Sequence, residues 1–395
     1  MKINTDLKTI DEVLRRGVEE ILPSREKLKS LMRKRKIRVY LGIDPTGKRL
    51  HLGHTIGLKK LQEFAELGHE AILVVGTGTV FAGDPSLRDS PRPLITSKEV
   101  RENIKNWKNQ LKRVVDFSKV KIRYNGEWLL KLKLKDIIKI ASHISAAKLF
   151  QREMFQRRLK RGDTVWTHEI LYPLLQGYDS VALNVDLEIG GTDQTFNMLV
   201  GRELLKKMKN KEKFILTFPL ILGIDGQPMS KTRGNCVWIE DSPEEMFGKL
   251  MSIPDSLIGD YLLFTNLSLK EIQKIKRDLL KSKPRQAKEE LAKEVVAFYY
   301  GEGKARKAVE EFKRVFKEKK LPQKIPEIEI KEKKINILDL LIKAKLLPSK
   351  SEAKRMILQG GVKINRKRIS DWKTQIEIKK GTVIQVGKRK FVKIK

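Results

Sequence analysis

The chain of 395 residues contains one cysteine, Cys236, and only 7% aromatic residues. A single cysteine excludes an internal disulfide and a cluster of thiolate ligands around a metal. Runs of the roughly 18 apolar residues that a membrane-spanning helix needs are absent. Residues 1–16 are charged and lack the apolar segment of a secretory signal. We therefore expect a soluble, cytoplasmic protein with no membrane partner and no metal site of its own.

Positive charge is the feature in excess. Lysine and arginine number 84 against 49 aspartate and glutamate residues, which gives a net charge of +35. Residues 331–395 alone hold 20 basic and 5 acidic side chains. The alternative is a uniformly solvated basic surface with the Lys/Glu enrichment of hyperthermophiles. Charge gathered in one short segment fits a phosphate-backbone footprint better, so a nucleic acid is the expected partner.

Short apolar segments alternate with amphipathic ones over the first 240 residues. Strands are predicted at residues 37–43, 71–75, 120–124, 181–189 and 214–217. Helices are predicted mainly at residues 5–35, 54–67 and 135–178. This alternation predicts an α/β fold with a Rossmann-like, doubly wound parallel sheet. Ligands in such sheets bind beyond the carboxyl ends of the strands.

After residue 240 the alternation of short apolar and amphipathic segments ends. Ser242 and Ser268 each precede a glutamate in capping-box spacing, which predicts helices after both. Near the end, a helix is predicted at 335–347, and Ser349 and Gly360 have the residue types that open and close a second one. The predicted domains are a catalytic domain at 1–235 (N-terminal helices 1–35, helical insertion at about 115–175), an α-helical domain at 236–325 and a small α+β domain at 332–395.

Residues 40–54 carry the first chemical signal. An apolar strand ends at the turn Asp44-Pro45-Thr46-Gly47, and a helix begins near His54. A helix N-terminus after a strand suits an anion, because free N–H groups and the helix dipole face the ligand. We therefore expect phosphate to be handled here. The alternative is a turn whose histidines merely cap a helix.

A second signal is the loop that runs from Gly226 to Arg233 and carries Ser230, Lys231 and Thr232. A glycine-flanked loop with a lysine and two hydroxyls can close over a triphosphate and neutralise developing charge. Taken alone, however, this loop fits a polar surface turn better.

The two signals together resemble the H-x-G-H and M-S-K-T signatures of class I aminoacyl-tRNA synthetases, above all the bacterial tyrosyl enzymes. The resemblance continues in order along essentially the whole chain. Its further blocks are Tyr40-x-Gly42-x-Asp44-Pro45-Thr46, Gly83-Asp84-Pro85-Ser86, Tyr172-x-x-x-Gln176-x-x-Asp179 and Gly190-Gly191-Thr192-Asp193-Gln194. The terminal block resembles an S4 RNA-binding domain through Ser349-Lys350-Ser351-Glu352-Ala353 and Gln359-Gly360-Gly361-Val362.

This resemblance implies that tyrosine and ATP form tyrosyl-adenylate and pyrophosphate, and that the tyrosyl group then passes to the 3′ end of tRNA(Tyr). It also implies Mg²⁺ with the ATP, no tightly bound cofactor, and a homodimer. The residues implied for L-tyrosine are Tyr40 and Asp179 at the phenol, Asp84, Tyr172 and Gln176 at the ammonium, and Gln194 at the carboxyl group. Those implied for ATP are Gly42, Asp44, Thr46, His51, Gly53, His54, Gly191, Asp193, Met229, Ser230 and Lys231. The implied catalytic residues are Thr46, His51, His54, Lys231 and Thr232, and the implied RNA-binding residues are Lys350, Lys354, Arg355 and Lys363.

The chain departs from the family pattern at two places. Pro228 stands where the mobile loop usually has its first lysine, so Lys231 must carry more charge, with Arg233 or Arg88 assisting. Glu188 replaces a neutral residue of some tyrosyl enzymes and is left out of the predicted site. Arg92 matches a basic residue that serves the pyrophosphate.

Three other functions are compatible with part of the pattern. A tryptophanyl enzyme shares the fold and the phosphate signatures, but indole has no phenol hydroxyl for Tyr40 and Asp179. A non-catalytic RNA-binding protein explains the charge but not the phosphate signatures. A small nucleotidyltransferase with an H-x-G-H motif explains neither the chain length nor the basic end.

Deletion of residues 332–395 tests the modular organisation. We expect the shortened protein to form tyrosyl-adenylate at the normal rate, because the predicted tyrosine and ATP residues all precede the deletion. We expect tRNA charging to weaken, because the deleted segment carries the concentrated positive charge. Pyrophosphate exchange and tRNA aminoacylation measure the two steps separately, and equal loss of both contradicts a separate RNA-binding module.

Overall fold

The structure is a computed structural model that describes residues 2–86, 90, 92–229, 233–280, 282–318, 321–322, 325–387 and 390–395. The chain divides into two compact units. The first unit comprises Met1–Glu240 and Ile253–Val295, and the second comprises Asp241–Ser252 and Val296–Lys395. Among the described residues, none of the helices has the length and apolar character needed to cross a membrane.

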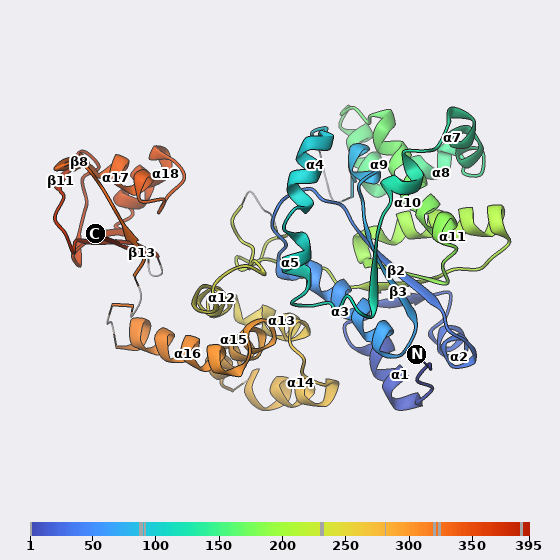
Figure 1. Ribbon diagram of the computed structural model, residues 1–395, viewed down its shortest axis with the longest axis horizontal. Helices are drawn as coiled ribbons and strands as arrows, with labels where there is room; N and C mark the ends of the chain where they lie inside the picture. Colours follow the sequence, from blue (N-terminus) through green and yellow to red (C-terminus); the bar gives the residue numbers. More distant parts are fainter. Residues whose placement is uncertain are drawn as a thin grey trace. The chain divides into compact units, whose positions relative to one another are not determined.

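A six-stranded sheet forms the centre of the first unit (Figure 1). Its strands are β1 (Glu20–Leu22), β2 (Arg38–Ile43), β3 (Glu70–Val75), β4 (Val120–Tyr124), β5 (Leu187–Gly191) and β6 (Phe214–Phe218). Their spatial order is β1-β6-β5-β2-β3-β4, with every neighbouring pair parallel except β1 and β6. From β2 the chain adds β3 and then β4 on one side of β2. It then crosses back and adds β5 and β6 on the other side, so the strand order reverses between β2 and β5. The predicted parallel-sheet α/β fold is confirmed, and this reversal is where such sheets bind ligands.

Helices pack on both faces of the sheet. On one face lies α3 (Leu52–Glu66), whose Gly57 is so close that an added Cβ would lie 2.7 Å from the Phe218 ring and 3.1 Å from Leu41. Tyr40, the neighbour of Leu41 in β2, reaches instead to Ser180 on α10 (Thr167–Leu183). Because successive side chains of a strand point to opposite faces, α3 and α10 lie on opposite sides of the sheet. The helix α11 (Thr195–Lys209) packs against α10 (Figure 1).

Shorter helices complete the first unit. They are α1 (Leu7–Arg15), α2 (Arg25–Lys34), α4 (Ser97–Ile104), α5 (Trp107–Leu111), α6 (Gly126–Leu129), α7 (Leu134–Ala141), α8 (Ala146–Phe150), α9 (Glu153–Lys160), α13 (Ile258–Tyr261) and α14 (Leu269–Ile275), and α15 (Pro284–Tyr300) runs from this unit into the second. A capping box opens α4: the Glu99 N–H donates to Thr96 Oγ1 at 3.3 Å, and the Thr96 N–H donates to Glu99 Oε2 at 2.8 Å.

Two predicted elements are wrong. Residues 20–22, predicted as helix, form β1, because they pair antiparallel with β6, nearly 200 positions along the chain. Residues 181–183, predicted as strand, form the last turn of α10, where Val181 and Leu183 are buried. Asn184 ends that helix in the left-handed conformation, with φ of 50°, and β5 begins only at Leu187. Both errors arise because packing against distant residues outweighs local propensity.

The second unit contains α12 (Pro243–Leu250) and α16 (Glu302–Phe312), which pack together, and a small α+β region. The elements of that region are β7 (Glu327–Ile328), β8 (Lys334–Asn336), α17 (Ile337–Lys343), α18 (Lys350–Leu358), β9 (Val362–Ile364), β10 (Lys367–Arg368), β11 (Gln375–Glu377), β12 (Val383–Val386) and β13 (Lys390–Ile394). The predicted caps of α18 are present: Ser349 accepts the Glu352 N–H at 3.2 Å, and Gly360 follows the helix with φ of +70°. The helix predicted at 335–347 is shorter, because residues 334–336 form β8. The three domain boundaries stay a prediction.

The contact between α3 and the sheet predicts the effect of Gly57→Ala. We expect a loss of about 1–3 kcal/mol in the free energy of unfolding, because the added methyl group overpacks the contact with Phe218 and Leu41. Gly303→Ala in α16 is the control, since nothing lies within 4 Å of its added Cβ. Thermal or denaturant unfolding measures both, and equal effects of the two substitutions contradict the close packing of α3.

Candidate active site

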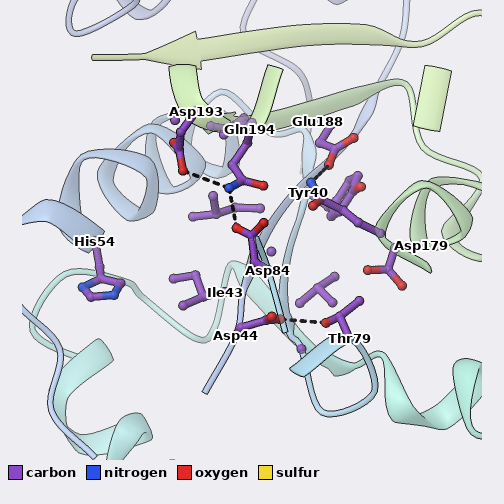
Figure 2. A pocket seen from close by; sticks show the side chains of 18 of the residues that line it. Tyr40, Ile43, Asp44, His54, Thr79, Asp84, Asp179, Glu188, Asp193 and Gln194 are labelled. Carbon is purple, nitrogen blue, oxygen red and sulfur yellow. Dashed lines mark hydrogen bonds between the residues drawn. The ribbon is translucent and has the colours of Figure 1, made fainter. Parts of the chain in front are cut away.

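A cavity of about 250 Å³ opens where β2 and β5 end, at the reversal of strand order. The predicted residues that line it are Tyr40, Gly42, Asp44, Thr46, Gly53, His54, Asp84, Tyr172, Gln176, Asp179, Gly191, Asp193 and Gln194. They come from segments that span more than 150 positions of the chain. In Figure 2, His54 lies at one side of this pocket, and Tyr40, Asp179 and Glu188 lie at the other.

The start of α3 holds both histidines at the nucleotide side of the predicted site. His51 is the N-cap residue of α3, and its N–H donates to Nδ1 of His54 at 3.2 Å. The two rings lie 3.9 Å apart between centroids. A Cβ at Gly53 would lie 3.0 Å from the His51 ring and 3.1 Å from the Met229 sulfur. Four residues predicted for ATP therefore meet here, and a side chain at position 53 would crowd His51 and Met229.

Asp84 forms the centre of a second group. Its Oδ1 accepts bonds from the Ser86 N–H and hydroxyl at 3.0 and 2.7 Å, and its Oδ2 accepts one from Gln194 Nε2 at 2.7 Å (Figure 2). The same Gln194 nitrogen donates to Asp193 at 2.9 Å, and burial raises the pKa of Asp193. Asp84, predicted for the ammonium group of tyrosine, Gln194, predicted for its carboxyl group, and Asp193, predicted for ATP, are thus joined by hydrogen bonds.

Asp44, predicted for ATP, lies against residues on the tyrosine side. Its carboxylate accepts hydrogen bonds from the Thr79 hydroxyl at 2.7 Å and the Tyr172 hydroxyl at 3.0 Å. Burial raises its pKa to about 7, and the nearby charge of Asp84 adds to the shift. An ammonium ion bound between these carboxylates would favour their charged forms.

Tyr40 and Asp179 occupy the deep end. The Tyr40 hydroxyl lies 3.0 Å from Ser180 Oγ, and burial raises its pKa. Asp179 accepts bonds from Trp128 Nε1 at 2.8 Å and Asn125 Nδ2 at 3.1 Å, and burial raises its pKa too. These three partners are missing from the predicted site. Asn125 directly follows a predicted strand, and this position could have indicated it as a site residue. The sequence around Ser180 and Trp128 gave no such signal.

Two buried charged residues at this end were also missed. Glu188 accepts a hydrogen bond from Gln176 Nε2 at 3.0 Å and forms an ion pair with Lys213. Both side chains of the pair are almost fully buried. The signal was a glutamate inside an otherwise apolar strand, because an acidic side chain is almost never fully buried unless it is paired.

Of the residues predicted for ATP, His51 and Met229 are not among those that line this cavity. Ser230, Lys231, Thr232 and Arg88 fall outside the described residues. Arg92 lines the cavity and donates from Nε to the Asp84 carbonyl at 2.9 Å. The four predicted RNA-binding residues are exposed in the second unit, on α18 and β9. Within the part of the chain that the structure describes, no cluster of three or more His, Cys, Asp or Glu side chains is suited to hold a metal.

The buried position of Asp44 predicts a pH-dependent gain from Asp44→Asn. Because the folded pKa is raised to about 7, the wild-type protein loses stability as pH rises from about 4 to 7. The asparagine cannot ionise, so we expect a gain that grows over this range to roughly 2–4 kcal/mol at pH 8. Thermal unfolding across pH measures it.

Asp186→Asn is the control of opposite sign. Although burial acts to raise the pKa of Asp186, hydrogen bonds from Arg35 and the Arg38 N–H outweigh it, and the pKa is lowered. Asp186 therefore stabilises the protein above about pH 4, and its variant should lose stability at neutral pH. A gain for Asp44→Asn that is equal at pH 4 and pH 8 contradicts the assigned ionisation.

Comparison with known proteins identifies the family. Residues 32–317 match the family "tRNA synthetases class I (W and Y)", and residues 317–394 match the "Tyrosine--tRNA ligase SYY-like C-terminal domain". The tyrosine–tRNA ligase of Thermotoga maritima is 43% identical over 387 residues, which cover 97% of this chain and 96% of that protein. The tyrosine–tRNA ligase of Haemophilus influenzae is 42% identical over 395 residues, which cover 99% of this chain and 98% of that protein.

Solved structures show the same fold. The C-terminally truncated mitochondrial tyrosyl-tRNA synthetase of Aspergillus nidulans matches with a TM-score of 0.67 and 22% identity, covering 78% of this chain and 94% of that one. The Archaeoglobus fulgidus enzyme, solved with L-tyrosine, matches with a TM-score of 0.62 and 23% identity, covering 77% and 100%. Fold, family match and full-length similarity agree, and the chain belongs to the tyrosyl-tRNA synthetases of the bacterial type, within class I.

Proposed function

We propose that the protein is a tyrosine–tRNA ligase, which activates L-tyrosine with ATP and transfers the tyrosyl group to the 3′ end of tRNA(Tyr). The observation that carries this proposal is the composition of one cavity. Its deep end holds Tyr40 and Asp179, and its opposite side holds His54 at the start of α3. A phenol site and an anion site at the two ends of one pocket suit an amino acid and a nucleotide that must react with each other.

Both ends of the tyrosine substrate, its ammonium group and its phenol hydroxyl, have matching partners in the cavity. Asp44 and Asp84 supply carboxylates for the ammonium group, and Gln176 Oε1 is a buried acceptor with no hydrogen-bond partner among the described residues. Charge-assisted hydrogen bonds of this kind are roughly twice as strong as neutral ones. Tyr40 and Asp179 then recognise the phenol hydroxyl. Phenylalanine would leave these buried groups unpaired, which is the source of discrimination in such sites.

The first step requires no general base. The α-carboxylate of tyrosine arrives charged and attacks the α-phosphorus of ATP, while pyrophosphate leaves. Catalysis therefore rests on positioning and on stabilising charge at the leaving group. Thr46, His51, His54, Lys231 and Thr232 are the proposed donors, each worth roughly 3 kcal/mol or about a hundredfold in rate. Mg²⁺ bound to ATP would neutralise further phosphate charge.

The remaining partners follow from the same family assignment. The exposed Lys350, Lys354, Arg355 and Lys363 are proposed to contact the tRNA backbone. A homodimer is proposed as well, with α7 and its neighbourhood as a candidate contact, because Leu130, Leu134 and Ile138 are 65%, 73% and 59% exposed. The proposed place of action is the cytoplasm.

Amino-acid-dependent exchange of pyrophosphate into ATP tests the function. We expect exchange with tyrosine and none with tryptophan or phenylalanine. In Tyr40→Phe we expect kcat/KM for tyrosine to fall about 10- to 100-fold with the KM for ATP unchanged, because one buried hydrogen-bond partner is lost.

Tyr178→Phe is the matched control, since Tyr178 is on α10 but packs against the cluster between α10 and α11. It should exchange normally. Exchange with tryptophan but not tyrosine would establish the tryptophanyl alternative, and no exchange with any amino acid would favour a non-catalytic RNA-binding protein.

A further inference from the structure

Lys213 is a buried cation that the proposed reaction does not use. Its side chain is 0% exposed, and that of its partner Glu188 is 2% exposed. Its ammonium group donates to the Glu188 carboxylate and, at 2.9 Å, to Ser180 Oγ. Burying two charges costs several kcal/mol each before their attraction is counted, and a well-packed apolar pair is often as stable. Stability alone therefore does not explain this pair.

The sheet register directs Lys213 toward the deep end of the cavity. Tyr40 in β2 pairs with Glu188 in β5, and Glu188 pairs with Ile215 in β6. Lys213 precedes Ile215 by two positions and so shares its face of the sheet. Tyr40 on β2, Glu188 on β5 and Lys213 just before β6 thus have their side chains on the same face of the sheet, the one covered by α10.

The helices above the sheet leave a space for the ammonium group. A Cβ at Gly201 in α11 would lie only 2.6 Å from Lys213 Nζ. A Cβ at Gly177 in α10 would lie 3.1 Å from the Gly201 Cα, so the two helices approach closely at a pair of glycines. Larger residues at either position would displace the lysine or separate the helices. The position of Lys213 is therefore determined by packing from three elements.

The pair is connected to two residues that line the cavity. Glu188 uses its Oε1 to accept from Gln176 Nε2 at 3.0 Å, while its Oε2 faces Lys213. Ser180, which accepts from Lys213, lies 3.0 Å from the Tyr40 hydroxyl. Gln176 and Tyr40 line the cavity, whereas Lys213 is not among the lining residues. Lys213 can therefore act on a bound substrate only through these neighbours.

On the basis of the proposed function, we propose that Lys213 is a positioning residue for tyrosine. It holds Glu188 and Ser180 in place, and these two residues orient Gln176 and Tyr40 for substrate binding. An ammonium group only donates, so it occupies acceptor positions on both neighbours and fixes them relative to each other. Its charge also offsets the repulsion between the carboxylates of Glu188 and Asp179 at the phenol end of the pocket. Because Lys213 touches neither substrate nor reacting atoms, its loss should affect tyrosine binding and leave ATP binding unchanged.

Other ionisable groups face the pair. Asp179 on α10 and Tyr40 on β2 approach it from the cavity side, and Arg202 on α11 approaches it from the other helix. Burial acts first to lower the pKa of Lys213, while Glu188 and Asp179 raise it and Arg202 lowers it. Without the lysine, the carboxylate of Glu188 would remain buried beside Asp179 with no cation to offset its charge.

Lys213→Gln tests the proposal by pyrophosphate exchange. We expect the KM for tyrosine to rise about 10-fold, with the KM for ATP unchanged, since a misplaced buried partner costs about this much. In the double variant Glu188→Gln/Lys213→Gln, we expect a smaller rise of roughly 3-fold, because no buried carboxylate is left without its cation.

Lys211→Gln is the matched control. Lys211 lies two positions before Lys213 in the chain, but it forms its ion pair with Asp186, at 3.0 Å. The control variant should leave the KM for tyrosine unchanged. An unchanged KM for tyrosine in Lys213→Gln, or equal rises for tyrosine and ATP, overturns the proposal. If Lys213→Gln does not fold, the KM values of the double variant decide. A rise for tyrosine alone supports the proposal, and no rise, or equal rises for tyrosine and ATP, overturns it. Absence of tyrosine-dependent exchange in the wild-type protein would instead reject the proposed function itself.

Discussion

Burial of carboxylates in one cavity is the constraint on which the site depends. Asp44, Asp179, Glu188 and Asp193 all lie in this pocket, and burial raises the pKa of three of them. A carboxylate removed from water needs donors or a cation in exchange. Asp179 has Trp128 and Asn125, Asp44 has Thr79 and Tyr172, and Glu188 has Gln176 and Lys213. The side chains around the pocket are arranged largely to supply these donors.

The same constraint explains why the site lies at the reversal of strand order. At that point β2 and β5 are neighbours, but the chain leaves them toward opposite faces. Tyr40 on β2 therefore contacts Ser180 on α10, on one face of the sheet. The chain after β2 turns at Asp44 and enters α3, which lies on the other face and carries the two histidines at its start. One β-strand and one helix thus bring the proposed phenol-binding group and the proposed anion-binding helix end to a single cavity. The turn at Asp44-Pro45 sets the separation between the two.

Much of this arrangement could be predicted from the sequence. Strands followed by polar or glycine-rich turns indicated the parallel sheet, and the parallel topology alone places those turns along one edge. The six residues expected for tyrosine came instead from the resemblance to the family, and all six line the same cavity. What escaped prediction depends on contacts between distant elements. β1 exists only because β6 offers it an edge, and Lys213 belongs to the site only because the register places it beside Glu188. Neither fact has a local signal, since a lysine before a strand ordinarily lies in solvent.

Carboxylates buried close together in one pocket disfavour one another's charged forms. Burial raises the pKa of Asp44 to about 7, so near neutral pH its carboxyl group holds a proton part of the time. In the proposed site, the ammonium group of tyrosine would bring positive charge beside Asp44, and its binding would lower the pKa of that carboxyl group and release a proton. Lys213 places a cation of the protein's own beside Glu188 at the deep end, where a phenol would bring none. On this proposal the substrate's own cation would offset the buried carboxylates at one end of the pocket, and a buried lysine offsets them at the other.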